Sequence, residues 1–590
     1  MATRLPPVDV VIIGVGWAGS ILAAELSRAG LKVVGLERGG YRGQEQIVMP
    51  EAHDQLKYDR RLEHFEDLSR STITIRNTTD ELARPQRRHG PFPWGEGLGG
   101  AGFHWAGWTW RHTPPDFKLR SHVIERYGAD MIPETSTIQD WPITYDELEP
   151  YYDQFEYAIG LSGKAGNIKG QIQAGGNPFE GPRRRDYPNP PLKQCHAGAL
   201  FEAAANELGY HPFPVPAAQA SQPYTNPYGV SMGECVYCGF CMNYGCEVSA
   251  KSVPQTTTLP AALDSGNFEV RTNAAVIRIN TSGNRATGVT YIDGQGREME
   301  QPADIVALAA FTWSNSQLLM VSGIGEPYDP GTGTGLVGKN YAWHGASVFA
   351  PLAYEDGHIF NTFMGTGALG TAICDLQGDN FDHGGLGFVG GNILCAMQMS
   401  GGPLGPFTVP TPPGTPGWGG EWKKAIAHYY NRMTWFVGIH DHLAYRGNYL
   451  SLDPNYRDKF GNPLIRLTYD IGPNEQKLSQ YMVAKCEEIA KAMKPSAHAV
   501  YGLPPRFDGG AAYGIVHQVG GAMCGESPAD SVVNKYMQSW DVPNLFVVGA
   551  SAFPQIPAFN PTGTVGALAY LAADAIKTRY VNSPGPLVDA

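Results

Sequence analysis

Long apolar runs and clusters of basic residues are both missing from this chain of 590 residues. No apolar stretch approaches the roughly 20 residues that a membrane-spanning helix requires, so we expect no transmembrane segment. Acidic side chains outnumber basic ones by 56 to 44, and the net charge of −12 argues against a nucleic-acid partner. Residues 1–7 are too few to hold the charged and apolar regions of an export signal, so we expect no signal peptide. Taken alone, these features predict a cytoplasmic protein.

Cysteine is scarce, with nine residues in the chain, and five of them are widely scattered. The other four, Cys235, Cys238, Cys241 and Cys246, follow the spacing C-x2-C-x2-C-x4-C. Thiolates this close together suit an iron–sulfur cluster, whose several iron atoms accept soft ligands from one loop. Structural zinc sites usually pair two separated C-x2-C motifs, so one zinc ion fits less well. Zinc and disulfides nevertheless remain alternatives.

The N-terminal region has the pattern of a strand, a tight turn and a helix. An apolar run at 8–13 leads into Gly14, Gly16 and Gly19 in the spacing G-x-G-x-x-G, and residues 20–29 have helical spacing. Gly14 permits the turn and Gly16 lets the backbone approach a pyrophosphate. Gly19 lets the helix pack on the strand while its first amides face the phosphates.

A second apolar run follows at residues 31–36 and ends in Glu37. An acidic side chain at this place can accept hydrogen bonds from an adenosine ribose. The complete unit predicts a dinucleotide site, and this motif does not distinguish FAD from NAD.

The C-terminal region contains candidate residues for chemistry at an alcohol. His517 has the side chain best suited to take a proton from a hydroxyl group near neutral pH while hydride leaves the adjacent carbon. The amide of Asn560 could hold the same oxygen. The N-terminal amides of the helix that begins after Pro561 could stabilise negative charge on a reduced ring.

Other segments show a mixture of strands and helices. Residues 268–280 and 288–292 predict neighbouring strands, and 304–310 predicts a buried strand. Strand signals dominate from about 341 to 510, with a helical segment around 473–493. The chain is therefore expected to have an α/β fold with more than one domain.

The order of these motifs resembles that of the glucose–methanol–choline (GMC) oxidoreductase family. The resemblance includes the glycine turn with Glu37, the glycine-rich segment 97–105, the segment 141–152, and the blocks around His517 and Asn560. It implies an FAD enzyme with a Rossmann-like FAD-binding domain and a substrate domain built on a largely antiparallel sheet.

The same resemblance implies a division of the chain and roles for individual residues. His517 would be the active-site base, and Asn560 would take the second catalytic position. The implied parts are the FAD-binding domain (1–135, 251–340 and 513–590), cap elements (136–230), an iron–sulfur loop (231–250) and the substrate-binding domain (341–512). The implied FAD contacts are Gly14, Gly16, Gly19, Glu37, Gly99, Gly100, His104, Trp105, Gly549, Ala550, Pro561 and Thr562.

The cysteine-rich insert resembles that of the flavoprotein subunits of bacterial membrane-bound sugar and sugar-acid dehydrogenases. This subgroup implies a 3Fe-4S cluster, held by Cys241 and Cys246 with one or both of Cys235 and Cys238, while a fourth ligand would permit 4Fe-4S. It also implies a small subunit with a twin-arginine export signal and a multihaem cytochrome c subunit that delivers electrons to quinone. The chain would then lie on the periplasmic face of the inner membrane, held there by its partners.

Within this subgroup, members that oxidise D-gluconate to 2-keto-D-gluconate are the most similar. Fructose, sorbitol and 2-ketogluconate are alternative substrates. A soluble GMC oxidase with a structural zinc loop is a further alternative. A flavoprotein that only relays electrons is disfavoured, because relay needs no paired proton-handling groups such as His517 and Asn560.

Overall fold

The computed structural model describes residues 2–49, 51–87, 94–355, 357–361, 363–398, 411–507 and 517–589. The predicted boundary between residues 512 and 513 lies outside these residues. None of the helices within the described ranges is both long and apolar enough to cross a bilayer.

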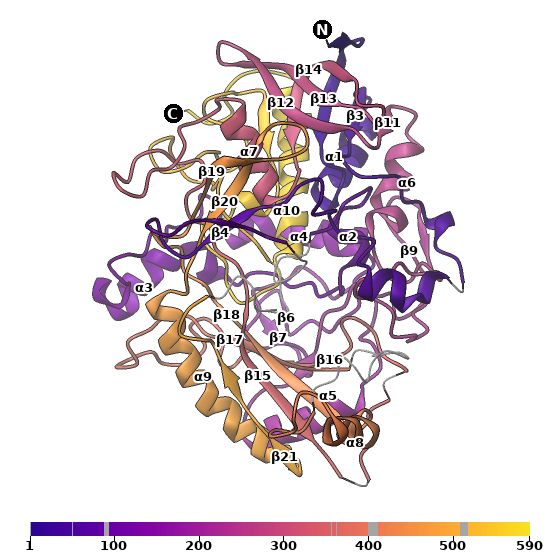
Figure 1. The fold of residues 1–590 in the computed structure, drawn as a ribbon, viewed down its shortest axis with the longest axis vertical. Coiled ribbons are helices and arrows are strands. Elements are labelled where there is room, and N and C mark those ends of the chain that lie inside the picture. Colours follow the sequence, from indigo (N-terminus) through magenta and orange to yellow (C-terminus); the bar gives the residue numbers. More distant parts are fainter. Residues whose placement is uncertain are drawn as a thin grey trace.

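A mixed sheet of eight strands forms the upper half of the molecule in Figure 1. Its centre is parallel, and its interior strands are apolar on both faces because helices cover them. The antiparallel pairs lie toward one end of the sheet. The path runs β11 (Phe268–Arg271), β3 (Val33–Leu36), β2 (Val8–Ile13), β14 (Glu298–Leu308), β13 (Arg285–Ile292) and β12 (Ala275–Ser282), with β1 (Thr3–Arg4) and β23 (Leu545–Val547) also paired to β14.

Helix α10 (Thr562–Ala575) is one of the most deeply buried elements of this half. It packs between α1 (Trp17–Arg28) and α4 (Tyr145–Ala158). Its small residues permit this close contact, since a Cβ added at Gly566 would lie 2.4 Å from the ring of Phe155.

An antiparallel sheet forms the lower half of the molecule (Figure 1). Helices α5 (His196–Glu207) and α9 (Pro473–Ala492) pack on it, and α9 matches the helix predicted around 473–493. The strands are β8 (Phe213–Pro214), β15 (Ala346–Ala353), β16 (Gly370–Ile373), β17 (Asn392–Met397), β18 (Met433–His440), β21 (Ala497–His498) and β22 (Tyr501–Gly502). The predicted fold class, α/β with a dinucleotide-binding sheet and a largely antiparallel second sheet, is confirmed.

A smaller sheet joins distant parts of the chain. Strands β19 (Tyr449–Arg457) and β20 (Pro463–Thr468) pair with each other, and β20 also pairs with β4 (Thr74–Arg76), which pairs with β5 (Arg84–Pro85). The remaining elements are α2 (Ala101–His104), α3 (Leu119–Tyr127), α6 (Thr258–Leu263), α7 (Thr312–Val321), α8 (Gly420–Tyr429), β6 (Asn167–Ile168), β7 (Gln171–Ile172), β9 (Tyr224–Thr225) and β10 (Ser231–Met232).

The turn between β2 and α1 brings backbone into unusually close contact. Gly14 has a φ of +85°, and a Cβ there would lie 2.7 Å from the carbonyl oxygen of Ala309. A Cβ at Gly19 would lie 2.0 Å from the carbonyl oxygen of Gly14. At Gly16, in contrast, the nearest atom would be 3.8 Å away. The first and third glycines therefore serve packing, whereas Gly16 borders open space.

These distances predict different effects for two matched substitutions in the apoprotein. Gly19→Ala should lower the free energy of unfolding by roughly 1–3 kcal/mol, because α1 must move away from the turn. Gly16→Ala should have a much smaller effect on the unfolding midpoint, measured by circular dichroism on heating. Equal losses in the two variants would contradict the packing role of Gly19.

His112 lies among aromatic side chains of the hydrophobic core. It is fully buried against the rings of Phe117, Trp141 and Phe553, and neither of its ring nitrogens has a hydrogen-bond partner among the described residues. Burial lowers its pKa from 6.5 to about 3. The folded protein therefore keeps this imidazole neutral at pH values where the unfolded chain protonates it.

The pKa of His112 gives a test on pH-dependent stability. As the pH falls below 6.5, the unfolded state binds a proton that the folded state does not. The wild type should then lose up to about 1.4 kcal/mol of unfolding free energy per pH unit relative to His112→Leu. Urea unfolding of both proteins at pH 7.5 and 5.5 measures this loss. If the two proteins differ in unfolding free energy by the same amount at both pH values, His112 does not titrate in this way.

Candidate active site and cysteine loop

Three parallel strands end at one cavity in the upper half of the molecule. Gly14 follows β2, Ala309 and Ala310 follow β14, and Gly549 follows β23, and all of them line the cavity. Ligands of open α/β sheets bind at the carboxyl ends of the strands in this way. His517 lies on the wall of the same cavity.

Most of the predicted FAD contacts reach this cavity, and four do not. Gly19 packs on Gly14, Gly99 lies against Gln255, the ring of His104 lies 4.3 Å from that of Phe65, and Trp105 meets Trp17 edge-on. The predicted residues that line the cavity are Gly14, Gly16, Glu37, Gly100, Gly549, Ala550, Pro561 and Thr562.

Glu37 is held at the end of β3 by backbone groups. Its Oε2 accepts a hydrogen bond from the amide of Val15 at 3.1 Å, and its Oε1 accepts one from the amide of Gly39 at 2.9 Å. Burial raises its pKa, and these two hydrogen bonds oppose that rise. The carboxyl group is thus fixed at the edge of the cavity before any ligand arrives.

The cavity has the features that a dinucleotide requires. Helices α1 and α10 begin there, and neither has a side chain that caps its first amides. Exposed amides at helix N-termini attract phosphate and other negative charge. A Cβ at Gly549 would meet no atom within 4 Å, so this backbone also borders open space. The residues present therefore fit FAD.

His517 belongs to a chain of hydrogen bonds whose directions can be assigned. The indole nitrogen of Trp110, which can only donate, lies 2.8 Å from Oδ1 of Asn560. The amide nitrogen of Asn560 consequently faces Nε2 of His517, at 3.2 Å. Because that amide nitrogen can only donate, Nε2 of His517 is the unprotonated nitrogen of the ring.

His344 completes the arrangement on the other side of the ring. Nδ1 of His517 lies 3.2 Å from Nδ1 of His344, so the proton of His517 is directed there. Burial lowers the pKa of His517 to about 3 and that of His344 well below 6.5. His517 is therefore neutral at physiological pH, and the lone pair on its Nε2 accepts the hydrogen bond from the Asn560 amide.

Sequence reasoning missed Trp110 and gave His344 no role. Trp110 lies 450 residues before Asn560, and no spacing pattern connects them. The only available signal was general, since the N–H of a buried tryptophan usually finds a hydrogen-bond partner.

The four clustered cysteines lie on one loop. Cys235 and Cys241 are buried, Cys238 and Cys246 are partly exposed, and all four are free thiols. Burial raises the pKa of Cys235 and of Cys241 to about 12, so a metal would have to displace their protons. Among the described residues, no three of these sulfur atoms lie within 4.8 Å of one another. One tetrahedral zinc ion would need sulfur atoms about 3.8 Å apart, so the loop would have to contract around it.

Hydrogen bonds connect this loop directly to the glycine-rich segment 97–105. The ammonium group of Lys251, which is fully buried, donates to the carbonyl oxygens of Cys241 at 2.7 Å and Trp105 at 3.3 Å. The backbone amide of Asn243 donates to the carbonyl oxygen of His104 at 2.8 Å. Because segment 97–105 also supplies Gly100 to the cavity wall, the cysteine loop and the cavity share one structural support.

Comparisons with known proteins agree with this architecture. Two models of the GMC oxidoreductase family match residues 197–346 and 444–569. The gluconate 2-dehydrogenase flavoprotein of Pantoea cypripedii is 46% identical, with 100% of this chain and 97% of the relative covered. The fructose dehydrogenase large subunit of Gluconobacter japonicus is 26% identical, with 98% of this chain and 99% of the relative covered.

A solved structure supports the same fold. Pyridoxine 4-oxidase from "Mesorbium loti" superimposes with a TM-score of 0.59 at 17% identity, and covers 96% of this chain and 98% of its own. The full-length similarity to the Pantoea relative and the two family models lead to one conclusion. The chain belongs to the GMC oxidoreductase family.

Proposed function

We propose that this protein is the flavoprotein subunit of a dehydrogenase that oxidises D-gluconate at C2 to 2-keto-D-gluconate. Electrons would pass from FAD through a 3Fe-4S cluster on the cysteine loop to a cytochrome c subunit and quinone. The carrying observation is the direct hydrogen bonding between the loop and segment 97–105, which forms part of the cavity wall. The 46% identity to a gluconate 2-dehydrogenase flavoprotein supports the substrate.

In this proposal, His517 carries out the proton transfer. On substrate binding, the C2 hydroxyl group would replace the Asn560 amide as the donor to Nε2 and give its proton to that nitrogen, and the Asn560 amide would then donate to the substrate oxygen. Trp110 and His344 act as positioning residues, because they fix the Asn560 amide and the tautomer of His517. When bound, FAD supplies the acceptor for the hydride that leaves C2.

The predicted cofactor residues have two roles in this proposal. Those on the cavity wall would contact FAD, with the N-terminus of α1 facing its phosphates, the N-terminus of α10 facing its reducible ring, and Glu37 facing its ribose. Gly19 and Gly99 would shape the backbone around it, and His104 and Trp105 would support the segment that presents Gly100.

The proposed electron path requires a one-electron carrier, which a cluster on the cysteine loop would supply. A hydride carries two electrons and a cytochrome accepts one at a time, so a one-electron carrier is needed between them. Cys241 and Cys246, with one or both of Cys235 and Cys238, would hold it. The partners would be a small subunit with a twin-arginine signal and a multihaem cytochrome c, which would keep the enzyme on the periplasmic face of the inner membrane. The relative named as a large subunit supports a multisubunit enzyme.

Fructose, sorbitol or 2-ketogluconate is the second candidate substrate, since the fructose dehydrogenase large subunit also matches nearly the whole chain. Its lower identity of 26% favours gluconate. A soluble oxidase with a zinc loop is less well supported, because no three loop sulfurs among the described residues lie close enough for one zinc ion.

The first test is turnover with an artificial electron acceptor. The wild type should oxidise D-gluconate, with 2-keto-D-gluconate identified by chromatography, in preference to fructose and sorbitol.

His517→Ala should lower kcat by roughly 10²- to 10⁴-fold while FAD absorbance is retained. Trp110→Phe should lower kcat more than it changes KM, because only the orientation of Asn560 is lost. Turnover of His517→Ala close to wild type would exclude His517 as the base, and a preference for another polyol would reject gluconate.

The second test concerns the cluster. The oxidised protein should give a low-temperature paramagnetic resonance signal near g ≈ 2, typical of 3Fe-4S, and contain iron. Cys241→Ser should remove the signal and stop cytochrome reduction while substrate still reduces the flavin. Cys486→Ser, which changes a buried thiol of helix α9, is the matched control and should keep the signal. Zinc in place of iron, lost in Cys241→Ser, would instead make the loop structural and favour the oxidase.

A further inference from the structure

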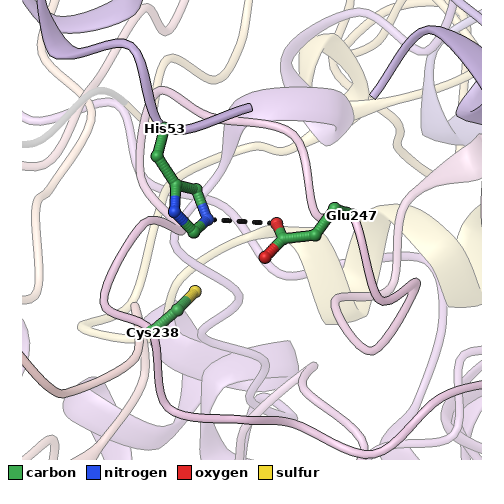
Figure 2. Close-up of side chains that lie close together, drawn as sticks. All are labelled: His53, Cys238 and Glu247. Carbon is green, nitrogen blue, oxygen red and sulfur yellow. Dashed lines mark hydrogen bonds and ion pairs between the residues drawn. The ribbon is translucent and has the colours of Figure 1, made fainter. Parts of the chain in front are cut away.

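A histidine from the N-terminal region meets a cysteine and a glutamate of the cysteine loop, as Figure 2 shows. Nε2 of His53 lies 3.1 Å from Oε2 of Glu247. One ligand atom from each of His53, Cys238 and Glu247 lies within 4.8 Å of the other two. Within the described ranges, no other group of three or more histidine, cysteine or acidic side chains is this compact.

The donor atoms of this group suit one metal in particular. Imidazole nitrogen, thiolate sulfur and carboxylate oxygen are the three ligand types of zinc sites. Calcium and magnesium prefer oxygen ligands alone, so the sulfur and nitrogen atoms disfavour them. A thiolate and a carboxylate also bring two negative charges, which a divalent ion balances. Three protein ligands leave the fourth tetrahedral position for water.

The surroundings hold the group in place without sealing it. The ring of His53 stacks on Phe240 with centroids 4.1 Å apart and an angle of 14° between the planes. The side chains of His53 and Glu247 are 17% and 18% exposed to solvent. A metal ion could therefore enter from solvent and find an oriented imidazole.

The group also separates Cys238 from the other clustered cysteines. Its sulfur lies within 4.8 Å of ligand atoms of His53 and Glu247, whereas among the described residues no three cysteine sulfurs of the loop lie this close together. We infer that His53, Cys238 and Glu247 bind one zinc ion, and that Cys235, Cys241 and Cys246 remain as the ligands of the cluster. The second part rests on the proposed function, and the first part does not. Three cysteine ligands are the number that a 3Fe-4S centre needs.

The zinc ion would join two segments that are distant in the sequence. His53 ends a short 3-10 turn, Glu51–His53, about 190 residues before the loop. Neighbouring hydrogen bonds already connect these segments: Gln44 donates to the carbonyl oxygen of Cys246 at 2.7 Å, and Asn243 donates to Asp59 at 3.0 Å. The metal would therefore fasten the cysteine loop to the N-terminal region at a point where side chains already meet.

Metal analysis of the full chain tests this site. Zinc and iron are measured on the same samples for the wild type, His53→Asn, Glu247→Gln and Cys238→Ser, and zinc affinity is measured by titration with Zn²⁺ alone. Loss of a residue that only supports a metal ligand lowers metal affinity roughly 10- to 100-fold. Each of these variants removes a ligand itself, so its zinc affinity should fall by more than that. Iron content and the resonance signal near g ≈ 2 should stay at the wild-type level.

A matched control uses a second histidine–carboxylate pair. Nδ1 of His211 lies 2.6 Å from Oδ1 of Asp375, with no cysteine in the group, so His211→Asn should leave zinc binding unchanged. Substitution with Co²⁺ provides a readout of the sulfur ligand, because thiolate-to-cobalt absorption should be present in the wild type and absent in Cys238→Ser. This absorption reports the site even if a variant binds zinc too weakly to measure.

Three outcomes would overturn the inference. Unchanged zinc affinity in His53→Asn and Glu247→Gln would exclude the site. Loss of iron in Cys238→Ser would make Cys238 a cluster ligand. Cobalt binding without thiolate absorption would remove the cysteine from the set. If every sample lacks iron, the proposed cluster fails, while the zinc titrations still decide whether the site exists.

Discussion

The pairing of β14 is the constraint on which the rest of the structure depends. Its C-terminal half pairs in parallel with β2 on one side and β23 on the other. This ladder brings residues 13 and 548, which lie more than 500 positions apart, to either side of Ala309. The cavity is the space beyond the ends of these three strands. Without β14, β23 would have no strand partner in this sheet, and β2 would keep only β3.

Around His517, three polar side chains determine which ring nitrogen carries the proton. Trp110 determines the orientation of Asn560, and Asn560 determines which nitrogen of His517 is unprotonated. His344 accepts the hydrogen bond from the other ring nitrogen of His517. Each step follows from a group that can only donate or from the single proton of a neutral imidazole. Burial lowers the pKa of His517 and keeps the ring neutral, so Nε2 is unprotonated at physiological pH without a further base.

Local sequence patterns predicted the parts of the fold that depend on local geometry. The glycine spacing predicted the β2–α1 turn, because close packing at Gly14 and Gly19 leaves no room for side chains. The roles of His517 and Asn560 came from family resemblance, since an isolated histidine says little about its surroundings. Trp110 and the grouping of His53 with Cys238 could not be foreseen, because tertiary pairing brings them to their partners across hundreds of residues. His104 and Trp105 stay predictions as cofactor residues, and their rings pack against Phe65 and Trp17.

The position of α10 has a consequence for how the protein is made. This helix fills the space between α1 and α4, yet it is formed by residues 562–575. During synthesis the N-terminal half leaves the ribosome while the apolar faces of α1 and α4 still lack their partner. Folding of the dinucleotide half therefore cannot finish domain by domain from the N-terminus, as it does in many larger proteins. The nascent chain must be protected from aggregation until translation is almost complete.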